Sequence, residues 1–157
     1  MSIEKNIYFY KGTALKLHTH FHCAYNLKYH LVLVVKYRHK CLTEDLLKLA
    51  ETTCKRICDN WDFDMIEFGG ESDHVHILFS AYPSADLSVF INNIKTVSSR
   101  MIRKEHSEYL SLFFSKPTLW SRGYYLLSVG DVDLQKTKKF IQNQGKKNTY
   151  PSTAKPL

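Results

Sequence analysis

The chain has 157 residues, 44% of them hydrophobic, which suits one domain with a substantial core. It has no apolar run of the roughly 18 residues that a membrane-spanning helix needs, so we expect no membrane span. Residues 1–11 carry an acidic residue and no long apolar block, which is untypical of a secretory signal and favours a cytoplasmic protein. The formal net charge of +7 favours a polyanionic partner, although many basic domains bind no nucleic acid.

The four cysteines form no CxxC pair, so a structural zinc site is not expected. They are Cys23, Cys41, Cys54 and Cys58. Cys54 and Cys58 lie four residues apart within a helical pattern, which predicts that both line one buried helix face.

Strands and helices are predicted to alternate along the chain. Apolar residues recur at every second position over 27–35, and the other face of this segment is partly apolar too, which is typical of a central strand. Thr43 is a suitable N-cap for a helix that runs to about Trp61, with Glu44 and Asp45 favouring its N-terminus. Gly69-Gly70 and the polar residues after it are expected to turn the chain between two further strands.

The remaining elements follow from the same patterns. They are strands at about 62–68 and 74–81, a helix at 86–105, a loop over 108–123, a strand at 124–129 and a helix at 132–144. This order, β-α-β-β-α-β plus one helix, predicts an α+β fold of the ferredoxin-like split βαβ type, an antiparallel sheet with two helices on one face. We expect an N-terminal arm over 1–24, one domain over 25–145 and a flexible tail over 146–157.

His74 and His76 lie two residues apart on a predicted strand, so both imidazoles point to the same face. Two such nitrogens can hold manganese, zinc or magnesium together with further oxygen ligands. The alternative is a strand that presents two histidines to solvent. A second histidine-rich segment, His18-Thr19-His20-Phe21-His22, lacks a clear strand pattern and is expected to be a flexible arm that could scavenge metal.

The segment DHVHIL at 73–78 resembles the HUH motif of the small single-tyrosine transposases of bacterial and archaeal insertion sequences, the IS200/IS605-like superfamily. Four other segments agree with that family in order, from about residue 25 to about residue 145. They are YHLV at 29–32 leading to KYR at 36–38, VSSR at 97–100, LWS at 119–121, and KFIQNQ at 139–144.

The resemblance implies a prokaryotic, nucleoid-associated homodimer that binds DNA hairpins and cleaves and rejoins single-stranded DNA through a 5′-phosphotyrosine. It also implies a divalent metal, Mg²⁺ or Mn²⁺, held by His74, His76 and Gln144, with the last helix shared between subunits in many members. Residues 140 and 144 are four apart, so they share a helix face.

The family has tyrosine where this chain has Phe140, and a phenylalanine has no hydroxyl to attack phosphorus. The resemblance therefore implies a chain that binds DNA and metal but does not cleave, whether the substitution is engineered or natural. Phe140 as a residue at the edge of the core is the alternative. Tyr124, Tyr125 and Tyr150 are poor substitutes, two in a strand and one in the tail.

Basic residues near the predicted site are candidates for phosphate contacts, although each alone suits an ordinary solvated charge equally well. The candidates are Lys36, Arg38, Lys95, Arg100, Arg103, Lys104, Arg122 and Lys136.

Three other functions remain open at this point. One is a domesticated, non-catalytic protein that binds hairpin DNA, which Phe140 favours. Another is a replication-initiator nickase with the same histidine pair. The last is a metal-dependent small-molecule enzyme on a ferredoxin-like fold, which the net charge disfavours.

Overall fold

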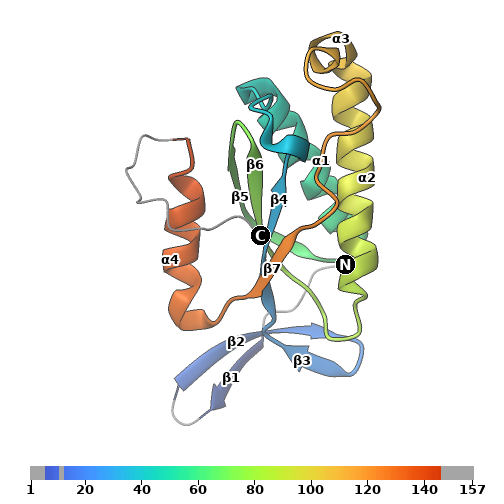
Figure 1. Cartoon of the computed structure of the whole chain (residues 1–157). Coiled ribbons are helices and arrows are strands. Elements are labelled where there is room, and N and C mark those ends of the chain that lie inside the picture. The colour runs from blue at the N-terminus through green and yellow to red at the C-terminus, as the bar shows by residue number, and fades with distance from the viewer. Residues whose placement is uncertain (1–5, 11–12, 146–157) are drawn as a thin grey trace.

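A computed structural model describes residues 6–10 and 13–145, which form two antiparallel sheets and four α-helices (Figure 1). The smaller sheet has the order β1 (Asn6–Tyr10), β2 (Thr13–His20) and β3 (Cys23–Tyr25). The larger sheet has the order β5 (Asp64–Glu71), β6 (His74–Ser80), β4 (Lys28–Val34) and β7 (Tyr125–Ser128). The helices are α1 (Glu44–Asn60), α2 (Leu87–Glu105), α3 (Ser107–Ser111) and α4 (Asp131–Gln142), and a short 3-10 helix, η1, spans Lys36–Arg38.

The larger sheet has the ferredoxin-like topology predicted from the sequence. In chain order β4, α1, β5, β6, α2 and β7 follow one another, yet β4 lies between β6 and β7. Each neighbouring pair in this sheet is antiparallel. The split βαβ prediction is therefore confirmed, with α4 added after the last strand.

The main core lies between this sheet and the helices α1 and α2. Strand residues such as Leu31 and Ile77 point into it from neighbouring strands, and Phe90 and Ile94 of α2 pack against them. Both helices begin where the sequence predicts. The Oγ1 of Thr43 accepts a hydrogen bond from the backbone nitrogen of Leu46, and a carboxylate oxygen of Asp86 accepts one from Val89.

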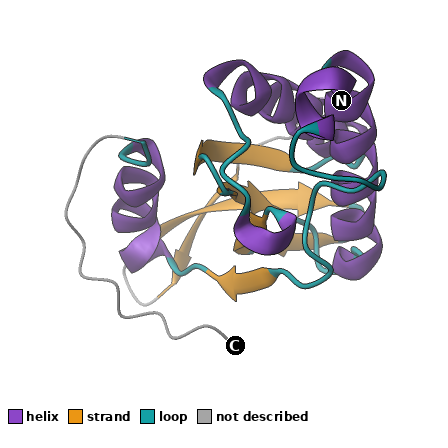
Figure 2. Ribbon diagram, turned by 45° about the horizontal axis from the view of Figure 1, so that its top comes forward, coloured by secondary structure: helices purple, strands orange, loops and turns teal. Residues whose placement is uncertain are grey.

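α4 covers the opposite face of the sheet from α1 and α2 (Figures 1 and 2). Its Ile141 is fully buried, and a Cβ added to Gly69 of β5 would lie 2.8 Å from the Cγ2 of Ile141. Only a glycine at position 69 therefore lets the helix approach the strand this closely. Lys28 of β4 forms an ion pair with Asp131 at the other end of α4.

Three local predictions are wrong. The turn expected over 69–73 is confined to Ser72-Asp73, and Gly69 and Gly70 belong to β5, because strand pairing and the contact with α4 override the turn preference of glycine. Residues 107–111, expected in a loop, form α3. The segment around His18 forms β2 and β3, so the flexible-arm prediction does not hold there.

The predicted tail over 146–157, with Tyr150, lies outside the described residues. Within the part of the chain that the structure describes, no helix is long and apolar enough to cross a bilayer.

Candidate functional site

The two histidines of the predicted pair lie on β6, on the face that α4 covers. Pairing with β4 sets His74 opposite Val34 and His76 opposite Val32. The residues between and beyond them, Val75 and Ile77, point into the main core, as strand alternation requires.

His74 is held by a carboxylate on one side and faces an amide on the other. Its Nδ1 lies 2.7 Å from Oδ1 of Asp73, whose second oxygen pairs with the Nε of Arg38 at 3.3 Å. A carboxylate only accepts, so Nδ1 carries the proton and Nε2 of neutral His74 keeps its lone pair. That Nε2 lies 3.2 Å from Oε1 of Gln144, and the amide is oriented because its Nε2 donates to the carbonyl of Phe140.

His76 is buried, with 6% of its surface exposed, and only one ring nitrogen has a partner. Its Nδ1 lies 2.8 Å from Nε2 of His30, while its own Nε2 is buried without a hydrogen bond. Burial, followed by the charges of His74 and His30, lowers the pKa of His76 to about 3, and the nearby amide of Gln144 opposes this shift. His76 is therefore a neutral imidazole at ordinary pH.

These atoms fit a divalent cation. Nε2 of His74 and Oε1 of Gln144 are both acceptors, and their separation of 3.2 Å is close to that of neighbouring ligands in an octahedron, about 3 Å for bonds of about 2.1 Å. A cation beside them would satisfy both acceptors and also the unpaired Nε2 of His76. The residues that could hold a metal here are thus His74, His76 and Gln144.

A carboxylate cluster lies beside the same imidazole. Ligand atoms of Glu71, Asp73 and His74 all lie within 4.8 Å of one another, a set that also fits a divalent metal. Asp73 is already engaged with Arg38 and His74, however, and Glu71 accepts a hydrogen bond from the backbone of Gly145 at 3.4 Å. The bond from His74 suits Asp73 as the group that orients this imidazole.

Phe140 of α4 lies over the histidines. Its ring centroid is 5.2 Å from that of His76 in an edge-to-face arrangement and 6.5 Å from that of His30. With 41% of its surface exposed, Phe140 is poorly suited to a role in the core. The helix ends at Gln142, two residues earlier than predicted, and Gln144 lies in the turn that follows.

Sequence reasoning missed His30, Glu71 and Asp73 as members of this cluster. Asp73 could have been found because it directly precedes His74. His30 lies next to Leu31, which with Leu33 points into the core, so strand alternation predicts that His30 lies on the opposite face of β4. Its contact with His76 depends on the register between β4 and β6, which the sequence does not predict.

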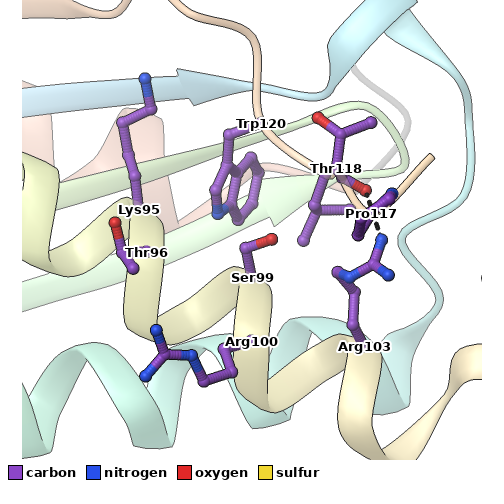
Figure 3. Close-up of a pocket in the computed structure, with 9 residues that line it drawn as sticks. Lys95, Thr96, Ser99, Arg100, Arg103, Pro117, Thr118 and Trp120 are labelled. Atoms are coloured by element: carbon purple, nitrogen blue, oxygen red, sulfur yellow. Dashed lines mark hydrogen bonds between the residues drawn. The ribbon is translucent and has the colours of Figure 1, made fainter.

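Three of the eight candidate DNA contacts gather in one pocket of about 410 Å³ (Figure 3). Lys95, Arg100 and Arg103 of α2 line it together with the loop at residues 117–120, and none of its lining residues is acidic. Arg103 points toward that loop, whereas Arg100 points away from it (Figure 3). Lys95 donates to the carbonyl of Arg122, and Arg103 to that of Thr118. Among the described residues, the Arg100 side chain has no hydrogen bond or ion pair.

The other five candidates lie outside this pocket. Arg38 pairs with Asp73 beside the histidines, and the Nζ of Lys36 lies 5.3 Å from the ring centroid of Tyr37. The remaining three, Lys104, Arg122 and Lys136, are exposed. Their side chains form no hydrogen bond or ion pair within residues 6–10 and 13–145.

The N-terminal histidines are held by aromatic rings. His20 stacks on Tyr82 with a centroid separation of 3.9 Å, and His18 on Tyr25 at 5.5 Å. In the described part of the chain, neither belongs to a cluster of three histidine, cysteine or carboxylate ligands. The stack on Tyr82 ties the smaller sheet to the segment that follows β6, whereas the stack on Tyr25 lies within the smaller sheet, between β2 and β3.

Known proteins share this arrangement of elements and motifs. The family model described as IS200-like transposase matches residues 23–144. The transposase of insertion sequence element IS200 from Salmonella typhimurium is 27% identical over 123 residues, which cover 78% of this chain and 80% of that protein. The ISDra2 transposase TnpA of Deinococcus radiodurans is 28% identical over 120 residues, covering 76% of this chain and 85% of that protein.

Two solved structures are similar in fold. A Deinococcus radiodurans protein assigned as a transposase has a TM-score of 0.66 at 23% identity, covering 80% of this chain and 96% of that one. A REP-associated tyrosine transposase bound to a REP hairpin has a TM-score of 0.56 at 10% identity, covering 80% of this chain and 71% of that one. Because the family model spans well over half of the chain and the relatives agree with it, the chain belongs to the IS200-like transposases, enzymes that process DNA in transposition.

Proposed function

We propose that this protein binds hairpins at the ends of an insertion sequence and carries the site of a single-strand DNA transposase, with residue 140 at the nucleophile position. The observation that supports this most strongly is the place of Phe140, whose ring lies 5.2 Å from that of His76 on the helix that also leads to Gln144. Because phenylalanine has no hydroxyl, the chain with Phe140 binds DNA and metal without cleaving the DNA.

The metal in this proposal is Mn²⁺ or Mg²⁺, held by Nε2 of His74, Nε2 of His76 and Oε1 of Gln144. When bound, the ion polarises a phosphate of the DNA strand. Asp73 keeps the proton of His74 on Nδ1, and burial of His76 excludes water from one side of the site. The side chain at position 140 approaches from the half-exposed side, where a DNA strand has access.

A tyrosine at position 140 would supply the missing reaction. Its phenolic oxygen would form a bond to phosphorus while the bond from phosphorus to the 3′ oxygen breaks. The products are a 5′-phosphotyrosine and a strand with a free 3′-hydroxyl, which takes up the proton that the phenol loses. Reversal of the same step onto another 3′-hydroxyl rejoins DNA.

The test is the Phe140→Tyr variant with single-stranded oligonucleotides that carry the hairpin ends of the element. We expect covalent protein–DNA adducts in Mn²⁺ or Mg²⁺ and none in EDTA. Phe21→Tyr, which adds a hydroxyl at an exposed site in the β2–β3 turn, is the matched control and should give no adduct. Absence of an adduct from Phe140→Tyr would refute the single-tyrosine assignment.

The role of His76 is tested in the same background. Adding His76→Ala to Phe140→Tyr should abolish cleavage, because one of three metal ligands is lost, while hairpin affinity stays within about threefold. Equal loss of both activities would mean that His76 serves only the fold.

We propose that the pocket of Lys95, Arg100 and Arg103 binds a phosphate of the single strand, and that the other five basic candidates add weaker contacts. The pocket offers three cations and the hydroxyls of Thr96 and Ser99, with no carboxylate to compete. Each cation that neutralises a phosphate releases a counterion, so binding should depend on salt.

Arg100→Ala should weaken binding of single-stranded DNA and reduce the slope of log affinity against log salt by about 1. Arg56→Ala on the exposed side of α1 is the control and should leave the slope unchanged. Equal slopes for Arg100→Ala and the unsubstituted protein would remove this pocket from the DNA surface.

We further propose a homodimer at the prokaryotic nucleoid, with residues 25–145 as its single transposase domain and the last helix as the element that subunits share. The fold similarity to a transposase bound to a REP hairpin supports DNA hairpins as the partner class. A domesticated protein that only binds hairpins is the second candidate, which Phe140 favours. The adduct assay decides between them, because a protein that lost cleavage long ago would not recover it through one substitution.

A further inference from the structure

The ring of His30 forms a hydrogen bond to Nδ1 of His76. It lies on β4, one strand from β6, on the same face of the sheet. The two histidines are 8% and 6% exposed, and Nε2 of His30 lies 2.8 Å from Nδ1 of His76. No step of the proposed reaction uses His30.

One proton lies between Nε2 of His30 and Nδ1 of His76. The ring that carries this proton determines which nitrogen of His76 is a donor. If Nδ1 of His76 carries the proton and donates to His30, Nε2 of His76 is a bare lone pair. If His30 donates instead, neutral His76 must carry its proton on Nε2, which makes no hydrogen bond in the structure and would have to turn toward the amide oxygen of Gln144, the neighbouring proposed ligand. The first arrangement avoids an unpaired buried donor and leaves a ligand atom facing the metal site.

We propose that His30 is a positioning residue that accepts the Nδ1–H of His76 and thereby keeps Nε2 of His76 unprotonated for the metal. Asp73 orients His74 in the same way, because its carboxylate accepts a hydrogen bond from Nδ1 of His74 at 2.7 Å. The two ligands are thus oriented by different groups, one a partly buried carboxylate and the other a buried imidazole. The role in metal binding rests on the proposed function, whereas the position of the proton does not.

Two substitutions separate hydrogen bonding from packing. Glutamine at position 30 offers a carbonyl acceptor at about the distance of Nε2, whereas leucine fills space without an acceptor. We expect His30→Leu to weaken Mn²⁺ binding 10- to 100-fold, as loss of a group that orients a ligand generally does. His30→Gln should stay within about threefold of the unsubstituted protein. Free Mn²⁺, followed by electron paramagnetic resonance during a titration of the whole chain, gives both affinities.

The proton itself can be observed in the metal-free protein. Nitrogen-15 shifts of histidine rings distinguish the two tautomers, and the signals of His76 are those that disappear in His76→Asn. We expect His76 of the unsubstituted protein to carry its proton on Nδ1. A proton on Nε2, or unchanged Mn²⁺ affinity in His30→Leu, would overturn the role of His30. Absence of Mn²⁺ binding in the unsubstituted protein, with the Nδ1 proton in place, would instead contradict the proposed metal site.

Discussion

Each histidine of the predicted pair has its Nδ1 engaged by a neighbour, Asp73 for His74 and His30 for His76, and His76 is also neutral. For His76 the main cause is burial, which lowers its pKa to about 3 from an ordinary value of 6.5. The same burial is a liability for stability in acid. An unfolded chain takes up a proton at His76 near pH 6.5, while the folded protein resists it down to about pH 3.

The free energy of unfolding of the metal-free protein should therefore fall as the pH drops below about 6.5. Above that value His76 is neutral in both the folded and the unfolded chain, so it adds no further change with pH. The sign follows because the unfolded state binds more protons between the two pKa values. The contribution of His76 to the slope is up to about 1.4 kcal/mol per pH unit. Urea unfolding in EDTA at pH 7, 6 and 5 would measure it.

His76→Asn should reduce this dependence, because asparagine does not titrate, and part of it should remain because burial also lowers the pKa of His30. His22→Asn, at an exposed position in the β2–β3 turn, is the control and should leave the dependence as it was. Parallel curves for His76→Asn and the unsubstituted protein would show that His76 does not titrate as the burial implies.

The sequence predicts some residues of the site and not others, for reasons of distance along the chain. Strand alternation predicts that His74 and His76 share one face, because they are two residues apart. Phe140 and Gln144 were assigned from the family resemblance, with their spacing of four residues in agreement, although α4 ends at Gln142 and Gln144 lies in the turn after it. Their association across 70 residues came only from the family resemblance. The contact of His30 with His76 needs the register of β4 against β6, and the pocket around Arg100 needs the path of the 117–120 loop.

At the scale of elements, the site depends on how α4 docks against the sheet. Ile141 anchors the helix against Gly69, and the side-chain amide of Gln142 donates to Glu67 at 2.9 Å. The ion pair of Lys28 with Asp131 fixes its other end. Displacement of α4 would move residue 140 and Gln144 away from His74 and His76 together.

Gly69→Ala should displace α4, because the added methyl would meet the backbone carbonyl and the Cγ2 of Ile141. We expect a loss of about 1–3 kcal/mol in the free energy of unfolding, with faster amide exchange over residues 131–142 than in the unsubstituted protein. Urea unfolding and hydrogen exchange with mass spectrometry would measure the two effects.

Gly123→Ala is the matched control, since a Cβ there meets nothing within 4 Å. Its unfolding free energy should stay within about 0.5 kcal/mol of the unsubstituted protein. Equal behaviour of the two alanine variants would show that α4 does not rest on Gly69.

Elements with a strong periodic pattern, such as α1, α2 and β4, were predictable with their caps and buried faces. Where the prediction failed, tertiary contacts decide the structure. Gly69-Gly70 reads as a turn, yet pairing with β6 extends β5 through both residues. The segment around His20 has no strand pattern of its own, and its pairing with β3 and stacking on Tyr82 supply the order.

For the whole molecule, the proposed homodimer needs an interface, and the edge of the larger sheet offers one. β7 pairs on one side only, with β4, and exposes Tyr125 and Leu127 there. An edge strand with apolar side chains favours pairing with another chain. α4 contacts the histidines of its own chain, so sharing of this helix would require it to leave the contact with Gly69.

Leu127→Lys should shift the protein from dimer to monomer, because it places a charge within the proposed interface at a residue that is 58% exposed. Light scattering after size exclusion should show a fall from twice the chain mass of 18.4 kDa to that mass. Leu112→Lys, at a 78% exposed position directly after α3, should remain dimeric. A monomeric unsubstituted protein would contradict the dimer, and a dimeric Leu127→Lys would exclude this edge.

The central claim is that one metal lies between His74, His76 and Gln144, beside residue 140. A crystal soaked in Mn²⁺ and measured for anomalous scattering locates the ion directly. We expect a single peak in contact with Nε2 of His74, Nε2 of His76 and Oε1 of Gln144. A peak held by Glu71 and Asp73 without His76 would contradict the claim.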